Sequence, residues 1–200
     1  MKYTEIENKI AEAQKTIDEA NEMLKALRSS KIKRPEIGRT VEIAGMNWTV
    51  LDKNEQGYIC LGDKIEKLQF GTTNDWKESS VREYLNGEFQ QKLSEQIGAE
   101  NIILFSRDLL SLDGQTEYGT CEDSVSLISL DEYRKYRKYI PNAEYFWWML
   151  TPDSTRFNND SKWISVVNPS GNVRGCGFDV RLGVRPFCIF SSSLFESEEE

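Results

Sequence analysis

The stretch Tyr145-Phe146-Trp147-Trp148-Met149-Leu150-Thr151-Pro152 opens the part of the chain that decides the fold. That part closes with GVRPFCIF at residues 183–190, and between the two blocks short apolar runs alternate with polar residues rich in Asn, Asp, Ser, Gly and Arg. This spacing predicts a set of short antiparallel strands. Adjacent residues of a strand point to opposite faces, so we expect one of Trp147 and Trp148 in the core and the other under a loop or at a surface.

Length and charge set the broad class of protein. The chain has 200 residues, enough for one domain and an appendage, and its net charge is −8. Four acidic residues in the last five positions mark residues 191–200 as a solvated acidic tail. The acidic balance argues against nucleic acid as a partner, because phosphate binding needs a basic patch.

The chain carries no visible targeting signal. Its first residues are polar and charged, unlike a signal peptide, and no apolar run has the length of a membrane span. We therefore expect a cytoplasmic or virion-associated protein without a signal peptide and without membrane insertion.

The absence of histidine limits the chemistry. It excludes Ser-His-Asp and Cys-His catalysis and every His-ligated metal site. Cys60, Cys121, Cys176 and Cys188 form no CxxC pair, so we expect reduced thiols that are buried or half-buried. A Cys176–Cys188 disulfide is a less favoured alternative. We predict a protein that is not an enzyme and has no catalytic residue, cofactor or metal.

Residues 3–28 have heptad spacing. One seam position holds Tyr3, Ile10, Ile17 and Leu24, and the other holds Ile6, Ala13, Ala20 and Leu27. So narrow an apolar stripe predicts a helix, residues 1–30, that self-associates through Ile6, Ile10, Ile17, Leu24 and Leu27 as a parallel dimer or trimer. The alternative is that the stripe packs on the chain's own globular domain. A linker at residues 31–36 follows.

Residues 37–190 are expected to form one α+β domain with twisted antiparallel strands and two or three short helices. Strands are predicted at 40–51, with a turn near Ala44-Gly45, and at 58–61, as a β-meander. A helix capped by Ser79 or Ser80 is predicted to end at Asn86-Gly87, before a second helix that stops near Gly98. Further predictions are strands at 102–105 and 125–130, a loop at 111–124, and a short helix from Asp131.

Four sequence elements resemble those of an uncharacterised family from Gram-positive bacteria and their phages. Residues 76–87 are similar to the family's W-x-x-S-x-x-R-x-x-L-N element, and residues 127–133 to its L-L-S-x-x-E-Y element. Residues 147–152 are similar to W-W-L-R-S-P, and residues 183–186 to G-V-R-P. Here Met149-Leu150-Thr151 stands where the family has Leu-Arg-Ser. The N-terminal helix lies outside the resemblance.

The resemblance implies a variant of the C-type-lectin fold, shared with formylglycine-generating enzymes and with the variable proteins of diversity-generating retroelements. It implies a ligand face built by the last third of the chain. We expect structural roles for Trp147, Trp148, Arg82 and Arg185, the last as a buried arginine bonded to backbone carbonyls. In retroelement relatives the variable positions cluster in this last third.

Residues 153–181 are the predicted recognition face, because Asn, Ser, Gly, aromatic residues and Arg are typical of adaptable binding surfaces. The alternative is a plain polar sheet face with a turn at 168–172. The predicted ligand-binding residues are Asn158, Asn159, Asp160, Trp163, Asn172, Arg174, Phe178, Asp179 and Arg181.

Two other chemistries remain open for this region. Asp153, Asp160 and Asp179, with Asn158 and Asn159, offer oxygen ligands for calcium, but without the dense spacing of a strong site. Formylglycine-generating enzymes bind copper through a cysteine pair, and the resemblance gives Cys176 and Cys188 as the only comparable pair here.

We predict a non-catalytic ligand-recognition module, phage- or prophage-encoded and displayed in several copies, that binds protein or glycan through residues 153–181. The runner-up is a structural or assembly protein of a phage particle that docks another protein. A formylglycine-generating-enzyme-like oxidase is a remote third reading.

Overall fold

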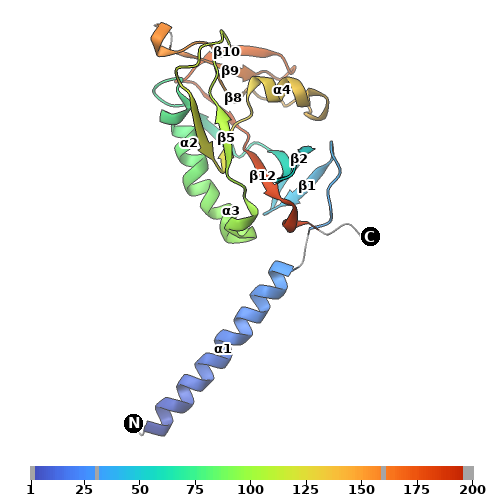
Figure 1. Cartoon of the computed structure of the whole chain (residues 1–200), viewed down its shortest axis with the longest axis vertical. Helices are drawn as coiled ribbons and strands as arrows, with labels where there is room; N and C mark the ends of the chain where they lie inside the picture. The colour runs from blue at the N-terminus through green and yellow to red at the C-terminus, as the bar shows by residue number, and fades with distance from the viewer. Residues whose placement is uncertain (1–2, 30–31, 159–160, 196–200) are drawn as a thin grey trace. The chain divides into compact units, whose positions relative to one another are not determined.

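The computed structural model describes residues 3–29, 32–158 and 161–195. The chain divides into two compact units, Met1–Lys33 and Arg34–Glu200, which Figure 1 colours from blue at the N-terminus to red at the C-terminus. We describe each unit by itself.

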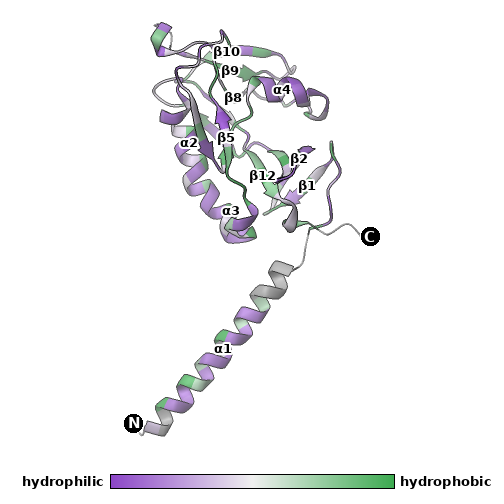
Figure 2. Cartoon of the chain, in the orientation of Figure 1, coloured by the Kyte–Doolittle hydropathy of each residue, from purple (hydrophilic) through white to green (hydrophobic). Residues whose placement is uncertain are grey.

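The first unit contains the helix α1, Tyr3–Ser29. The described seam side chains are exposed, with 82% of Tyr3, 44% of Ile6, 63% of Ile10 and 52% of Ile17 accessible. Figure 2 shows apolar residues recurring along α1 among polar ones. The side chains of Leu24 and Leu27 lie outside the described residues. Helix α1 thus presents its apolar seam to solvent along the part that the structure describes.

The second unit is built on two five-stranded sheets, which confirms the predicted α+β class. The first sheet has the order β1-β2-β3-β12-β7 and is antiparallel throughout. Its strands are β1 (Thr40–Ile43), β2 (Met46–Lys53), β3 (Gly57–Gly62), β7 (Val125–Ser126) and β12 (Phe187–Ser191). The meander β1-β2-β3 is present as predicted. Its first turn has positive φ at both Ala44 (53°) and Gly45 (70°), the two-residue geometry that suits a hairpin.

The second sheet has the order β10-β9-β8-β11-β4. Only β8 and β11 are parallel, joined at Trp147 and Gly183; the other pairs are antiparallel. Its strands are β4 (Glu66–Gln69), β8 (Trp147–Pro152), β9 (Trp163–Val167), β10 (Val173–Gly177) and β11 (Arg181–Val184). A third, two-stranded sheet pairs β5 (Phe105–Asp108) with β6 (Thr120–Asp123).

Both tryptophans of β8 are buried, so of the two positions expected for the second ring, under a loop or at a surface, the surface position is wrong. Trp147 (1% exposed) packs edge-on against Tyr133, with ring centroids 5.7 Å apart. Trp148 (0% exposed) packs on Phe70, and its Nε1 donates to the Leu68 carbonyl over 2.9 Å. Strand β8 lies inside its sheet and is covered on both faces, so all six of its residues are buried.

The helices of the second unit cover the sheets. They are α2 (Ser80–Tyr84), α3 (Gln90–Ile97) and α4 (Leu130–Tyr136), with a π-turn at Leu85–Phe89 and short 3-10 turns at Trp76–Glu78, Ala99–Asn101, Arg137–Tyr139, Arg156–Asn158 and Ser192–Leu194. Ser79 caps α2 and Gly98 (φ 85°) ends α3, as predicted. The predicted break at Asn86-Gly87 is wrong, because the π-turn joins α2 to α3 in one helical run, aligned along one side of the domain in Figure 1.

Four more predicted boundaries shift. The predicted strand 125–130 stops at Ser126, because Ser129 and Glu132 form a capping box that starts α4. The strand expected at 102–105 is β5, three residues later, and the predicted loop 111–124 contains β6. Residues 191–195 are not part of a frayed tail, because Phe195 is buried (1% exposed) against Tyr58, with ring centroids 4.7 Å apart.

Buried polar contacts lock the elements together. Asp123, fully buried, accepts hydrogen bonds from Trp76 Nε1 (2.6 Å) and Arg82 Nε (2.7 Å). The Asn86 side chain accepts from the backbone N–H groups of residues 124 and 125. The 76–87 element therefore clamps the strand that carries Asp123.

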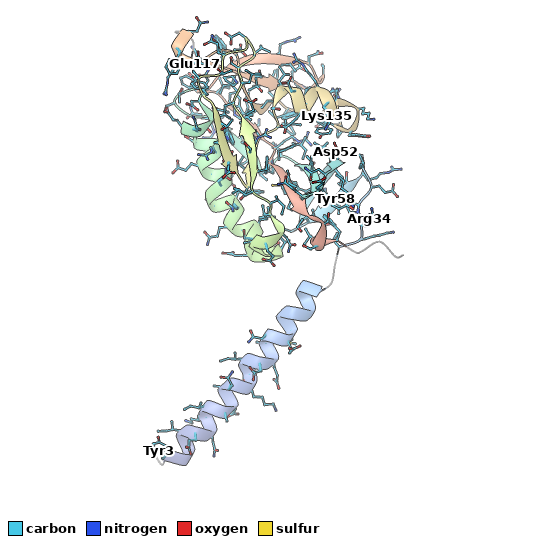
Figure 3. All side chains as sticks on the ribbon, viewed as in Figure 1. Tyr3, Arg34, Asp52, Tyr58, Glu117 and Lys135 are labelled. Carbon is cyan, nitrogen blue, oxygen red and sulfur yellow. The ribbon has the colours of Figure 1, made fainter. Side chains whose placement is uncertain are left out.

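Two arginines are buried in aromatic surroundings. Arg185 (3% exposed) donates to the Gly62 carbonyl over 2.9 Å and lies 5.1 Å from the Trp147 ring, and burial lowers its pKa. Arg107 (4% exposed) makes a bidentate pair with Glu132. On the surface, Lys135 Nζ reaches Asp52 over 3.1 Å and ties α4 to β2 (Figure 3).

Candidate functional site

The predicted recognition face rests on the hairpin of β9 and β10 at one edge of the second sheet. Trp163 pairs with Gly177 and Val167 with Val173. The turn between them is closed by Asn168, whose Oδ1 accepts the backbone N–H groups of Ser170 (3.0 Å) and Asn172 (2.9 Å), while Gly171 supplies a φ of 79°. This is the turn predicted at 168–172.

Trp163 is the main exposed aromatic residue of the hairpin, with 42% of its surface accessible. It stands directly across from Gly177, which offers no side chain. A Cβ atom on Gly177 would meet Asp179 Oδ1 at 2.8 Å and Lys162 Cε at 3.3 Å, and Lys162 Nζ lies 5.5 Å from the Trp163 ring centroid. We call this group, Lys162, Trp163, Gly177 and Asp179, the Trp163 cluster.

Asp153 extends the Trp163 cluster along the same side of the hairpin. Gly175 pairs with Ser165, two residues from Trp163, and therefore shares its face. A Cβ atom on Gly175 would come 2.9 Å from Asp153 Oδ2. The space over the two glycines is thus filled by the side chains of Lys162, Asp179 and Asp153, which gather there beside the indole ring.

The structure does not bring all the predicted ligand-binding residues to this face. Arg174 pairs with Val166, so it points to the opposite side of the sheet, and it donates to the Val173 carbonyl over 2.8 Å. Arg181 belongs to β11 and donates to the Lys67 carbonyl over 2.8 Å. Phe178 is half-buried and is held by backbone hydrogen bonds to Phe70 and Lys162.

The remaining predicted residues occupy loops. Asn172 is exposed at the end of the hairpin turn. Asn158 is exposed, and its Nδ2 donates to Ser154 Oγ over 3.3 Å. Asn159 and Asp160 lie outside the described residues. Of the nine predicted ligand-binding residues, Trp163 and Asp179 are the two that the structure places in one cluster.

A second exposed aromatic side chain lies in the loop between β8 and β9. Phe157 is 63% exposed, and the Arg156 guanidinium group lies 5.5 Å from its ring centroid. Arg156 also forms an ion pair with Glu78 over 3.1 Å. The loop therefore presents an aromatic ring beside a cation that is already partly neutralised.

Asn74 organises the loops below this face. It is fully buried, and its Nδ2 donates to the carbonyls of Ser154 (2.9 Å) and Trp163 (3.1 Å), while its Oδ1 accepts from the Tyr118 hydroxyl (2.7 Å). Three chain segments far apart in sequence are joined through one side chain. No sequence signal marks this role, because an asparagine in a polar loop resembles any other turn residue.

A separate cavity of about 360 Å³ lies at the start of α4. Its walls include Leu110 and Leu112, which are 38% and 49% exposed, with the buried Leu130 and the hydroxyl-bearing Thr151. The charged part of its lining is formed by Asp108, Asp131 and Arg134, the last two of which pair over 3.2 Å. This cavity combines apolar walls with a charged margin and was not foreseen from the sequence.

The thiols are not tuned for nucleophilic chemistry. Burial raises the pKa of Cys121 to about 11 and also raises the pKa of Cys60, Cys176 and Cys188, whereas an activated cysteine needs a lowered pKa. Cys176 lies on β10 and Cys188 on β12, in different sheets, and both are free, so the alternative disulfide is absent. Cys188 instead stands across from Cys60.

Within residues 3–29, 32–158 and 161–195, no group of three or more Cys, Asp or Glu side chains is arranged to hold a metal ion. None of the helices in the described part of the chain combines the length and apolar character of a membrane span.

Comparison with known proteins gives one match. No curated protein and no solved structure is significantly similar to the chain. A family model described as a domain of unknown function, DUF6273, matches residues 50–192. The match covers both sheets from β3 onward, the 76–87 clamp and the Trp163 cluster. The chain therefore belongs to the DUF6273 family.

Proposed function

We propose that this protein is a non-catalytic recognition module that binds a glycan through the Trp163 cluster and Asp153. One observation carries the proposal: a 42% exposed tryptophan stands beside a lysine and two carboxylates that pack over the glycines at 175 and 177. The apolar face of a sugar ring stacks on an indole, and its hydroxyl groups pair with carboxylate acceptors and an ammonium donor.

Rigid support favours recognition by this face. The backbone of Trp163 is tied to Asn74 and to Asp153, whose N–H donates to the Trp163 carbonyl over 3.1 Å. A ligand that stacks on Trp163 would therefore meet a side chain on an ordered strand and not on a free loop, which lowers the entropic cost of binding.

Several copies joined through α1 would raise the affinity for a repeated ligand without any new contact. The exposed seam of Ile6, Ile10 and Ile17 supports this part of the proposal, because an isolated helix with so narrow a stripe is marginal in water. A phage or prophage origin and a relation to the C-type-lectin fold are further proposals that rest on the four sequence elements. A retroelement template repeat near the gene would support diversification of residues 153–181.

The test is glycan-array binding of the full chain and of matched variants. Trp163→Ala should abolish binding to every glycan that the wild type retains, and Asp179→Asn should weaken it. Phe146→Ala is the control, because Phe146 is equally exposed, at 43%, but lies outside the Trp163 cluster. Equal loss in both aromatic variants, or no loss in Trp163→Ala, would contradict the proposal.

A second candidate function is docking of another protein, as a structural or assembly component of a phage particle. The cavity beside Leu110 and Leu112 favours it, because exposed leucines at the edge of a hollow are typical of protein contacts. A double variant distinguishes protein docking from glycan binding. Leu110→Ser with Leu112→Ser should abolish binding to a protein partner and leave glycan binding unchanged.

A further inference from the structure

The apolar seam of α1 complements itself when it is read in reverse. Residues of one seam position are Tyr3, Ile10, Ile17 and Leu24, and residues of the other are Ile6, Ala13, Ala20 and Leu27. In an antiparallel helix pair, each residue of the first position faces one of the second. Four such pairs share Lys15 as their midpoint, namely Tyr3 with Leu27, Ile6 with Leu24, Ile10 with Ala20, and Ala13 with Ile17.

Antiparallel pairing makes the combined side-chain size in the central layers of the seam the same. Each central layer then holds one isoleucine and one alanine, and each outer layer holds two large side chains. In parallel pairing each residue faces the same residue of the second copy. Layers of two isoleucines then alternate with layers of two alanines at Ala13 and Ala20. Close packing favours the arrangement in which large and small side chains interdigitate, because paired alanines leave a gap between bulky neighbours.

The polar positions beside the seam permit this orientation. In the antiparallel pair Lys9 flanks Met23, and Glu7 flanks Asn21, with Gln14 and Thr16 each meeting its own copy near the midpoint. No like charges face each other in these pairs. The parallel arrangement avoids repulsion as well, so the flanking charges do not choose between the two orientations and the core layers do.

We infer that α1 forms an antiparallel pair with α1 of a second copy of this chain, centred on Lys15. This inference rests on the self-association included in the proposed function, and it specifies its geometry. The overlap from Tyr3 to Leu27 spans about 37 Å at 1.5 Å per residue. The two recognition domains then leave the pair at opposite ends. Such a dimer bridges two separated ligands, whereas a parallel one would set both domains side by side on one surface.

The orientation is tested with spin labels on cysteines introduced in the full chain. Asn8→Cys and Lys15→Cys lie on the exposed side of α1, away from the seam, so neither change removes a seam contact. Both orientations place the two labels of Lys15→Cys at the same height along the axis, so this variant is the matched control. At Asn8→Cys the antiparallel pair adds an axial offset of about 21 Å, because the labelled sites stand fourteen residues apart along the axis. Its interspin distance is then longer than at Lys15→Cys, whereas the parallel pair gives equal distances at the two sites.

The outcomes separate this inference from the function on which it rests. Equal distances at both sites overturn the antiparallel pairing and are consistent with self-association in parallel. A light-scattering mass equal to one 23.1 kDa chain, with no dipolar coupling at Lys15→Cys, overturns both the pairing and multivalent display. Glycan binding by the Trp163 cluster is unaffected by either result. The unmodified chain, labelled in the same way, measures the background from Cys121 and Cys176.

Discussion

The buried ion pair between Arg107 and Glu132 should dominate the stability of the α4 region. Arg107 Nη1 and Nη2 donate to the two carboxylate oxygens over 2.6 and 2.7 Å, and the guanidinium group lies 5.1 Å from the Phe187 ring. Glu132 also accepts the Ser129 N–H in the capping box. One carboxylate therefore neutralises a buried cation and starts a helix.

The change Glu132→Gln isolates the charge. Glutamine keeps the size of the side chain and can still close a capping box, but it leaves the buried guanidinium without a counter-charge. Removing one partner of a buried pair costs roughly 3–5 kcal/mol. Because the Glu132 side chain is 25% exposed, we expect the lower end of that range, about 3 kcal/mol.

Urea unfolding followed by tryptophan fluorescence measures this cost. The control is Glu78→Gln, because Glu78 and Arg156 form an ion pair whose side chains are 53% and 50% exposed. Exposed pairs of this kind contribute about 0–1 kcal/mol. If Glu132→Gln lowers the free energy of unfolding no more than Glu78→Gln does, the assignment of a buried, stabilising pair is wrong.

The same pair sets an acid limit to stability. Burial by itself raises the pKa of Glu132, but the hydrogen bonds and charge of Arg107 and the bonds from Ser129 outweigh it, so that its pKa is lowered. Such a group stabilises the fold fully above its unfolded pKa of about 4.3, and the contribution is lost as the pH falls through the lower folded pKa. Wild type should therefore lose stability more steeply than Glu132→Gln below about pH 4; parallel curves would refute this.

Three further changes test other parts of the second unit. Asp123→Ala leaves Trp76 Nε1 and Arg82 without their acceptor and should cost about 3 kcal/mol in urea unfolding; a cost below 1 kcal/mol would mean that water replaces the carboxylate. Phe195→Ala should lower the free energy of unfolding by about 3 kcal/mol. An unchanged melting temperature would mean that residues 191–195 do not pack on the domain. Ala44→Gly should raise the free energy of unfolding by roughly 0.5 kcal/mol, because Ala44 adopts a φ of 53° that glycine tolerates better. A lower free energy of unfolding in this variant would contradict backbone strain at Ala44.

Local signals in the sequence predicted the elements whose cause is local. The meander follows from alternating residues and from Ala44-Gly45, and the ends of α2 and α3 follow from Ser79 and Gly98. The joined helical run was missed because Asn86-Gly87 has the composition of a helix end. Tertiary contact overrides it: the Asn86 side chain bonds the backbone at residues 124 and 125, which are distant in sequence.

The sequence indicated the range of residues that holds the candidate cluster, but not which side chains within that range lie together. Composition alone marked residues 153–181, and Trp163 and Asp179 do meet there. Arg174 falls on the opposite side of the sheet because it pairs with Val166, and strand register cannot be read from one chain's composition. Lys162 was missed for the same reason, and Asp153 was considered only as a calcium ligand. Their side chains lie over the glycines at 177 and 175.

The residues of the four sequence elements quoted above serve the fold. Trp76, Arg82 and Asn86 clamp the strand that carries Asp123. Trp147 and Trp148 are buried in β8. Arg185 is enclosed beside Trp147. Trp163, Asp179 and Lys162 belong to none of these elements. Under the proposed function, changes in the β9–β10 hairpin would alter the ligand while these four elements stay unchanged. Ligand specificity should be sought in the residues around Gly177, and membership of the family does not predict it.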